Sequence, residues 1–505
     1  MNKRAFAKNT AVLTATSLLL RLFGILFRIF VSNRVGAEGM GLYQLVFSVY
    51  LLGTAFAGAG LTTAVARLCA EHIAKGHTEN AKRVLYGAIT LAVGIGILSA
   101  AGIALGAPAI GRLLGDERAT GALRISGLGL PMAGISACLR GWFLARRNAA
   151  PTATGQMTEQ VVRIASILLL LRRKGSSSIP TACRMILWGD VLAEGMGAVW
   201  LMLAYGRDQK RLPASKAAKK APVWKPLLTI ACPLTAGRYL ATGLHTAENA
   251  LVPWRLSLFT GSAAVALAQF GAIKGMVLPV LFFPAAFVLT VAGLLVPELS
   301  DAAALGQTRQ VARITRSALS LAWPVGLWLG GLFALLGRPL GVFLYHSDEV
   351  GLYMQILGPL TPVMILDSVC SALLKGLNQQ MHALWFGVVD SAVRIAMIWV
   401  LLPRFGITGF LFVMLVSNLL TAWLSFQRLH TVSGVHLRPG KVLLPPLLTV
   451  LSAGGGAWMQ SVLPDGIGYS LLVGGGVSAV YFALLLLLGV WSVPCEKVIK
   501  KPLGC

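Results

Sequence analysis

The sequence has little charge and few acidic residues. Only 12% of its 505 residues are Asp, Glu, Lys or Arg, against roughly 25% in an average soluble protein, and the 18 acidic residues are outnumbered by 44 basic ones. The seven cysteines form no CxxC pair, which argues against a disulfide scaffold or a zinc module. Apolar residues fill the chain instead: 56% belong to the hydrophobic set, which indicates a membrane protein.

The sequence also lacks the short motifs of catalysis. It contains no GxSxG, no HExxH and no phosphate-binding glycine loop with a lysine. We therefore expect a transporter rather than an enzyme, without a cofactor or a metal and without direct use of ATP. The net charge of +26 lies largely in loops between apolar segments, so anionic lipid is the expected neighbour of these charges and nucleic acid is not.

Fourteen apolar segments are candidates for membrane spans. Seven windows of twenty or more residues carry no charged residue: 39–66, 84–111, 275–297, 317–337, 405–427, 442–464 and 466–495. Seven further stretches are interrupted by one or a few charges, near 10–33, 122–145, 157–171, 184–205, 227–250, 353–373 and 385–403. At about 20 residues per span, the sequence predicts an all-α polytopic membrane protein with about 14 transmembrane helices.

The basic residues predict the orientation of these spans. Most Lys and Arg fall in the N-terminal tail, in alternate loops and in the C-terminal tail, so the positive-inside rule places both termini in the cytoplasm. The largest basic cluster lies in the linker 207–226, where we expect anionic membrane lipid as its partner. A smaller cluster at 172–174 falls on the opposite side. The basic start and apolar run resemble a signal peptide, but the run is too long and contains Arg21 and Arg28.

Internal repeats predict the architecture. Residues 71–84 resemble residues 301–314 at an offset of 230, and residues 159–164 resemble residues 390–395 at an offset of 231. Pro131 and Pro362 match at 231 as well. We therefore expect an N-terminal six-helix lobe at 1–206, the basic linker 207–226, a C-terminal six-helix lobe at 227–430, and an additional two-helix hairpin with a cytoplasmic tail at 431–505. Parallel copies of this kind predict a cavity between the lobes.

Charges inside spans are the candidates for function, because each is costly in the bilayer unless it is paired or hydrated. Arg21 and Arg28 are seven residues apart on one helix face, and no carboxylate lies in their helix. We expect them to bind an anion from another span or a ligand such as a pyrophosphate; the alternative for Arg28 is snorkelling to the headgroups. Lys274 interrupts an apolar stretch and is expected to face the cavity.

Other intramembrane charges have close neighbours of opposite sign. Glu159 with Arg163 and Asp390 with Arg394 have i, i+4 spacing, so each pair either neutralises itself or contributes one member to ligand binding or ion coupling. The remaining candidates for cavity or coupling roles are Arg238 and Glu248, which with His245 form a polar stripe, and Asp367, which has no local partner; Asp190 and Glu194 are like charges on one span.

Several segments resemble one known family. The segments are 17–28, 35–44, 159–163, 274–279 and 296–302. They are similar to motifs of the stage V sporulation protein B family, whose members are polysaccharide-export-type proteins of the multidrug/oligosaccharidyl-lipid/polysaccharide exporter superfamily. The chain is also similar to lipid II flippases, whose cavity cations are carried by spans one, two and eight. Arg21, Arg28 and Lys274 occupy matching places, whereas the second span carries no cation.

The resemblance implies a flippase. Such a protein would move an undecaprenyl-pyrophosphate-linked saccharide from the inner to the outer leaflet of the bacterial cytoplasmic membrane by alternating access, for spore cortex peptidoglycan or a related polymer. Two alternatives stay open. A multidrug or cation antiporter of the same superfamily would need an acidic pocket, and a non-transporting membrane scaffold for cell-wall synthesis would not need its cavity charges.

Overall fold

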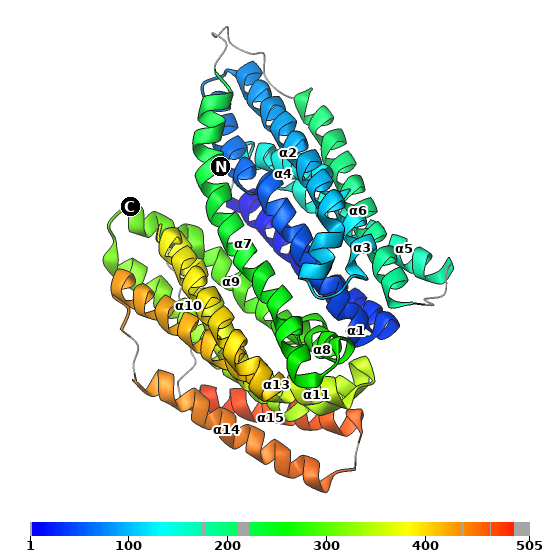
Figure 1. The fold of residues 1–505 in the computed structure, drawn as a ribbon. Helices are drawn as coiled ribbons and strands as arrows, with labels where there is room; N and C mark the ends of the chain where they lie inside the picture. The colour runs from blue at the N-terminus through cyan, green and yellow to red at the C-terminus, as the bar shows by residue number, and fades with distance from the viewer. Residues whose placement is uncertain (1–2, 174–177, 211–221, 437–438, 465, 489–505) are drawn as a thin grey trace. The chain divides into compact units, whose positions relative to one another are not determined.

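The computed structural model describes residues 3–173, 178–210, 222–436, 439–464 and 466–488. The basic residues Lys216, Lys219 and Lys220 of the predicted linker, Lys174 and the predicted C-terminal tail lie outside these ranges. The described part of the chain contains helices and no β-strand. The longer helices are α1 (Lys3–Ala74), α2 (Thr78–Leu113), α5 (Ala150–Arg173), α6 (Ile179–Gln209), α7 (Trp224–Thr260), α9 (Leu278–Ala304), α10 (Thr308–Tyr345), α13 (Gln380–Ser433), α14 (Pro439–Val462) and α15 (Ile467–Leu487) (Figure 1).

Shorter helices complete the order of elements. They are α3 (Ala119–Gly127), α4 (Leu130–Ala145), α8 (Ala263–Gly271), the π-helix η1 (Ala272–Val277), α11 (Asp348–Leu357), the 3-10 turn η2 (Gly358–Leu360) and α12 (Thr361–Gly376). Two long helices are broken at glycines with positive φ, α1 at Gly36 and α13 at Gly406. Glycine adopts this conformation without strain. Each of the two helices changes direction at its glycine and therefore contains two of the predicted spans.

The helices fit a membrane. Among the described residues, nine helices are long and apolar enough to cross a bilayer, or ten if the bent pair α3 and α4 forms one span. Within the described residues, each of the fourteen segments predicted from the sequence overlaps a helix, a helix pair or one half of a broken helix. The predicted all-α, multi-pass membrane class is confirmed. The number of fourteen crossings and the cytoplasmic side of the termini stay predictions.

The chain divides into two compact units. Unit 1 comprises Met1–Gly275 with Ile398–Gly406, and unit 2 comprises Met276–Met397 with Ile407–Cys505. The sequence repeat places its boundary in the linker 207–226, whereas packing groups α7 and α8 with unit 1. A sequence repeat shows which segments are copies of each other, whereas a packing unit shows which helices are in contact. The predicted lobe boundaries therefore stay a prediction about the copies.

Unit 1 is built around α1, which packs against α2, α4, α7 and α8. Small residues allow the closest approaches: a Cβ added at Gly60 would lie 2.2 Å from the carbonyl oxygen of Ala231 in α7. The backbone N–H of Gly60 donates to Thr235 Oγ1 of the same helix at 3.2 Å. Close contacts of this kind are typical of helix pairs in membranes, where small residues let backbones approach.

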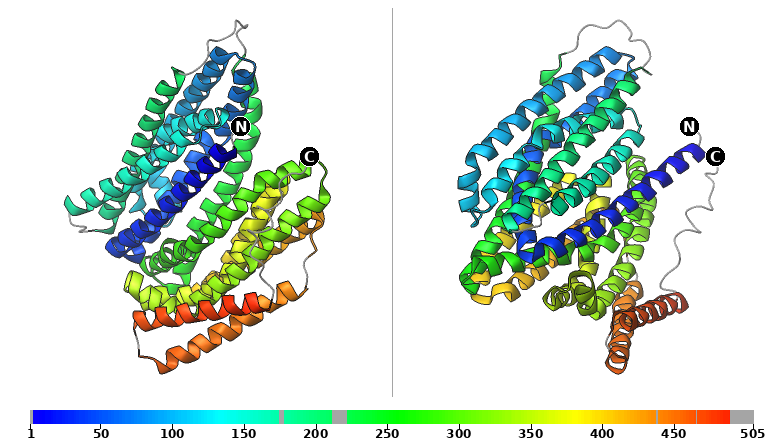
Figure 2. Two further views of the ribbon diagram at one scale, coloured as in Figure 1. Left: turned by 180° about the vertical axis from the view of Figure 1, so that it is seen from behind. Right: turned by 90° about the vertical axis from the view of Figure 1, so that its right-hand side faces the viewer.

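Unit 2 contains the C-terminal hairpin of α14 and α15, which lie side by side (Figure 2). Tyr481 of α15 donates from its hydroxyl to the carbonyl oxygen of Pro324 in α10 at 3.0 Å. Trp328 of α10 donates from Nε1 to Ser478 Oγ of α15 at 2.9 Å. These two hydrogen bonds join α15 to α10.

The internal repeat recurs in the backbone conformation. The turn after α2 and the turn after α10 both contain a left-handed residue, Gly115 and His346, at an offset of 231. Arg147 and Asn378 form a second left-handed pair at 231, and the glycines before α2 and α10 form a third at 230. The two copies therefore turn at the same places, as the sequence predicts.

The two prolines that match in sequence also make matching contacts. A Cβ added at Gly96 of α2 would lie 2.7 Å from Pro131 Cα, and a Cβ added at Gly326 of α10 would lie 2.9 Å from Pro362 Cα. Gly96 and Gly326 are themselves separated by 230 residues. The same glycine-to-proline crossing therefore joins the third predicted span of each copy to the fourth.

Candidate functional site

A cavity of about 350 Å³ lies within unit 1, between α1, α5 and α6. Its polar lining comes from all three helices: Arg28 and two tyrosines from α1, Glu159 and Arg163 from α5, and two carboxylates from α6. The polar side chains are Arg28, Tyr43, Tyr50, Glu159, Gln160, Arg163, Asp190 and Glu194. Three of the sequence-predicted residues, Arg28, Glu159 and Arg163, therefore meet at one cavity.

Arg28 is held at this cavity by the π-helix η1. Its Nε donates to the carbonyl oxygen of Gly275 at 3.0 Å, and Gln44 Nε2 donates to the carbonyl oxygen of Lys274 at 3.5 Å. A π-turn is wider than an α-turn and often marks a functional position. The two α1 side chains satisfy carbonyl groups of this irregular turn, which brings Arg28 next to the residue before Gly275, the predicted cation Lys274.

Glycines permit this arrangement. A Cβ added at Gly41 of α1 would lie 2.2 Å from the carbonyl oxygen of Leu267 in α8. A Cβ added at Gly271 of α8 would lie 2.0 Å from the carbonyl oxygen of Ala37. Both contacts follow the break at Gly36, where α1 changes direction. A larger residue at either glycine would separate α1 from α8 and so move Arg28 away from η1.

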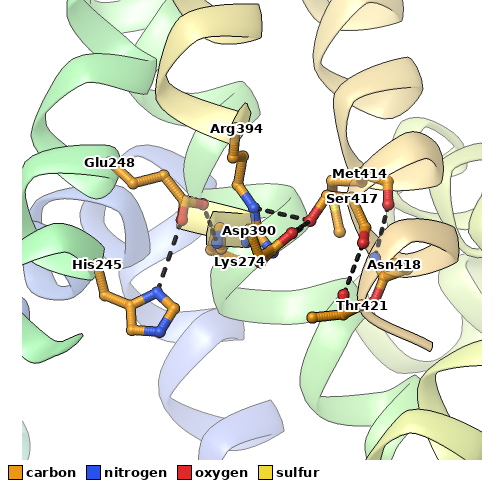
Figure 3. Close-up of polar contacts among 9 residues, drawn as sticks. All are labelled: His245, Glu248, Lys274, Asp390, Arg394, Met414, Ser417, Asn418 and Thr421. Carbon is orange, nitrogen blue, oxygen red and sulfur yellow. Dashed lines mark hydrogen bonds and ion pairs between the residues drawn. The ribbon is translucent and has the colours of Figure 1, made fainter. Parts of the chain in front are cut away.

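Lys274 forms an ion pair that the sequence does not reveal. Its Nζ lies 3.0 Å from Glu248 Oε1 of α7, and the Glu248 side chain is only 1% exposed. His245 Nδ1 lies 3.7 Å from Glu248 Oε2, as Figure 3 shows. Two members of the predicted polar stripe therefore meet at Lys274. The third, Arg238, is exposed and has no side-chain ion pair in the described part of the chain.

Arg163 is the centre of a larger charge network, here called the first-repeat cluster and consisting of Arg140, Glu159, Arg163 and Asp190. Arg163 Nη2 donates to Glu159 Oε1 at 2.8 Å, and its Nε donates to Asp190 Oδ1 at 2.9 Å. Arg140 Nη2 of α4 donates to Glu159 Oε2 at 3.3 Å. Tyr43 donates its hydroxyl to Asp190 Oδ2 at 3.0 Å. The network joins four helices, whereas the sequence predicted only the Glu159–Arg163 pair.

Unit 2 contains the counterpart, here called the second-repeat cluster and consisting of Asp390, Arg394 and Ser417 of α13. Arg394 Nη2 donates to Asp390 Oδ2 at 2.6 Å, and its Nε donates to Ser417 Oγ at 3.0 Å. Ser417 donates its hydroxyl to Asp390 Oδ1, and Figure 3 shows these contacts. The predicted Asp390–Arg394 pair is therefore present. Ser417 lies beyond the break at Gly406 and bonds across it.

The remaining predicted residues lie apart from these groups. Asp367 of α12 accepts a hydrogen bond from Ser425 Oγ at 2.8 Å, a partner that lies 58 residues away in the chain. Arg21 is exposed two turns before Arg28, and its side chain forms no hydrogen bond or ion pair within the described part of the chain. No group of three His, Cys, Asp or Glu residues that could hold a metal ion occurs among the described residues.

Comparisons with known proteins place these features in a family. The model of the polysaccharide biosynthesis protein family matches residues 6–290. The chain is 22% identical to stage V sporulation protein B of Bacillus subtilis (strain 168) over 501 residues, which cover 96% of each chain. It is 22% identical over 425 residues to the lipid II flippase MurJ of the same organism, covering 77% of this chain and 76% of the relative.

The fold has a solved counterpart. A structure of the lipid II flippase MurJ in an inward closed conformation matches with a TM-score of 0.72. The match covers 95% of this chain and 100% of the flippase, at 12% sequence identity. At this identity the likeness concerns the fold, a helical membrane transporter architecture that extends over 95% of the chain.

Proposed function

Because the chain belongs to the polysaccharide biosynthesis protein family, we propose that it is a flippase. The cargo is an undecaprenyl-pyrophosphate-linked saccharide, a precursor of peptidoglycan or of a related polysaccharide, and it crosses the bacterial cytoplasmic membrane by alternating access. The relatives support this choice, since one is a sporulation protein and another a lipid II flippase. A spore cortex precursor is the cargo that the first of them favours.

One observation carries the proposal: the guanidinium of Arg28 lines a cavity inside a membrane protein and lies beside η1, which carries Lys274. Guanidinium groups bind phosphoryl oxygens bidentately. A charged headgroup cannot cross the apolar core unaided. We assign pyrophosphate binding to Arg21, Arg28 and Lys274. Glu248 already neutralises Lys274, so the cargo would share Lys274 with this carboxylate.

The test is translocation of a defined undecaprenyl-pyrophosphate-linked saccharide in proteoliposomes that contain the purified full chain. We expect Arg28→Ala to abolish transport and Arg28→Lys to be partly active, because an ammonium is a point charge and cannot replace the bidentate fork. Arg124→Ala is the matched control, since Arg124 is an exposed cation of α3 outside the cavity. Wild-type transport by Arg28→Ala would contradict the proposal.

Lys274 needs a paired design because its removal leaves the buried Glu248 without this partner. Lys274→Met is expected to lower both folding and transport, since breaking a buried ion pair is strongly destabilising. Lys274→Met with Glu248→Gln should recover accumulation in the membrane more than transport. Recovery of both to the same degree would show that Lys274 has only a structural role.

A second candidate function is a multidrug or cation antiporter. It is favoured by the three carboxylates of the cavity, Glu159, Asp190 and Glu194, because such a transporter needs acidic groups. Competition separates the two functions: a lipid-linked saccharide should inhibit binding of an organic cation only if both use the cavity. A non-transporting scaffold for cell-wall synthesis is the third possibility, and it predicts full function after the cavity charges are neutralised.

We further propose fourteen spans with both termini in the cytoplasm, and anionic lipid beside the linker 207–226. Single cysteines in the loops 207–225 and 428–441, placed in a cysteine-free chain, should resist an impermeant thiol reagent in intact cells. Labelling of both loops from outside would invert the topology. We also propose candidates for a role in ion coupling. They belong to the first-repeat cluster, the second-repeat cluster, α7 and α12, and are Glu159, Arg163, Arg238, Glu248, Asp367, Asp390 and Arg394.

A further inference from the structure

A second pocket lies in unit 1 at the ends of α4, α5 and α6, away from the proposed cargo site. Its volume is about 250 Å³. The polar part of its lining comes from the loop after α4, the start of α5 and the last turns of α6, and includes Asn148, Thr154, Trp200, Arg207 and Asp208. Trp200 Nε1 donates to Thr154 Oγ1 at 3.1 Å. The tryptophan is thereby fixed across the pocket between α5 and α6.

The charge at this pocket is positive. Its carboxylate, Asp208, is buried and already bound: Trp142 Nε1 donates to Asp208 Oδ2 at 3.0 Å, and Arg146 Nε donates to the same oxygen at 3.3 Å. Arg207 lines the pocket and Arg147 precedes the lining residue Asn148. Both arginines are exposed, and neither has a hydrogen bond or ion pair from its side chain within the described ranges. Two cations are therefore available to an anionic ligand.

Arg147 occupies an unfavourable backbone conformation. Its φ is +53°, a left-handed value that Asn tolerates far better than Arg does. The matching residue of the second repeat is Asn378, with φ +58°. There the loop contains no arginine, and Arg428 Nη2 donates to Gln379 Oε1 at 2.7 Å. The first repeat thus places a strained cation where the second has a relaxed amide beside a contact made within the chain.

The helix surface beside the pocket resembles the surface of a membrane protein at the depth of lipid headgroups. Leu203 of α6 is 58% exposed and Leu144 of α4 is 65% exposed, as expected of side chains that face lipid tails. Arg207 lies one helical turn after Leu203 and two turns after Trp200, so the three side chains lie on the same face of α6. An apolar helix surface whose end carries a tryptophan and an arginine is typical of the membrane interface.

We propose that this pocket binds the phosphate headgroup of an anionic phospholipid, with Arg147 and Arg207 as its charged contacts. The lipid tails lie along the exposed apolar surface of α4 and α6, and Asn148 offers an amide donor to the headgroup. The site does not depend on the proposed cargo.

The test uses the purified full chain in a neutral detergent, titrated with phosphatidylglycerol or phosphatidylcholine, with bound lipid measured by native mass spectrometry. We expect preference for phosphatidylglycerol. Arg147→Asn and Arg207→Gln should each weaken its binding about fivefold, and the double variant about 25-fold, from the contribution of each basic residue near a charged lipid. Arg147→Asn is the conservative choice because Asn378 already occupies the matching left-handed position.

The matched control is the double variant Arg112→Gln, Arg124→Gln, which removes two exposed arginines from α2 and α3 and should leave phosphatidylglycerol binding unchanged. Three results would overturn the proposal: equal binding of both lipids by the unaltered protein, unaltered binding by the Arg147→Asn, Arg207→Gln variant, or equal loss in the control. Glycerol phosphate without tails should not displace the lipid at equal concentration; displacement would assign the pocket to a soluble phosphate instead.

Discussion

The first-repeat cluster and the second-repeat cluster have the same hydrogen-bond arrangement but differ in charge. In both, an arginine donates from Nη2 to the carboxylate one turn earlier on its own helix and from Nε to the next predicted span. The receiving residue is Asp190 in the first repeat and Ser417 in the second. At the repeat offset of 231, Asp190 itself aligns with Thr421, one helical turn beyond Ser417, so the two arginines contact different turns of the next span.

The difference is balanced elsewhere in the cluster. Arg140 of α4 contacts Glu159, whereas the residue at the repeat offset of 231 is Ser371 of α12. The first-repeat cluster thus contains one more carboxylate and one more guanidinium than the second-repeat cluster does. Unpaired charge inside a membrane protein is costly. A cluster of this kind can hold a further carboxylate when a cation accompanies it, and the carboxylate of Asp190 also lines the cavity of unit 1.

The largest expected effect comes from removing the centre of the richer cluster. Arg163→Met leaves Glu159 and Asp190 without their shared cation, so we expect a loss of about 3–5 kcal/mol of stability, as for other broken buried ion pairs. Thermal unfolding in mild detergent measures it. In a background of Glu159→Gln with Asp190→Asn, the same substitution should have a much smaller effect. An equal loss in both backgrounds would show that Arg163 stabilises by packing alone.

Making the second cluster resemble the first should be the next largest change. Ser417→Asp adds a carboxylate beside Asp390 where no counterpart of Arg140 exists, and an acidic residue at this depth costs about 2.5–3.5 kcal/mol. Membrane accumulation and the unfolding midpoint measure it. The loss should diminish at lower pH, because protonation removes the added charge, and it should grow as pH rises. Adding Ser371→Arg should recover part of the stability; no recovery would refute the charge-balance argument.

Much of the fold was predictable because it depends on periodic, local signals. The lengths of the apolar segments predicted where helices form. The repeat at 230–231 residues predicted two copies of one arrangement, and the chain turns at matching places in them, for example at Gly115 and His346. The i, i+4 pairs were predictable because both members lie on one helix. The sequence could not divide the chain into its packing units, since α7 follows the linker 207–226 yet packs on α1.

The partners contributed by distant helices were not predictable. Asp190 belongs to the first-repeat cluster, but in the sequence it looks like one of two like charges on α6. Glu248 reaches Lys274 from another helix, and nothing in their spacing indicates the contact. The π-helix left no recognisable signal either. One partial signal was available: the repeat offset of 231 aligns Arg163 with Arg394, so the partner of one arginine indicates which span holds the partner of the other. The residue that aligns with Asp190 is Thr421, and the actual partner, Ser417, lies one helical turn before it.

A smaller effect should be equal in the two repeats, because it tests what they share. Gly96→Ala and Gly326→Ala each direct a methyl group at the backbone of a proline, Pro131 or Pro362. Overpacking of this kind costs about 1–3 kcal/mol. The unfolding midpoints of the two variants should fall by similar amounts, and Gly94→Ala, where a Cβ meets nothing within 4 Å, is the control. A loss at only one of the two crossings would show that the repeats differ in packing as well as in charge.

The smallest expected effect is that of the hydroxyl that Tyr43 contributes to the first-repeat cluster. Tyr43→Phe keeps the ring, which stacks on Phe47 with ring centroids 5.5 Å apart, and removes only the hydrogen bond to Asp190. Arg163 still donates to Asp190, so the carboxylate keeps its cation and the loss should be about 1 kcal/mol. In the Asp190→Ser background, which gives the first cluster the hydroxyl of the second, Tyr43→Phe should have a smaller effect on the unfolding midpoint. If the two effects are equal, Tyr43 acts through its packing on Phe47, and its hydroxyl does not stabilise the carboxylate at position 190.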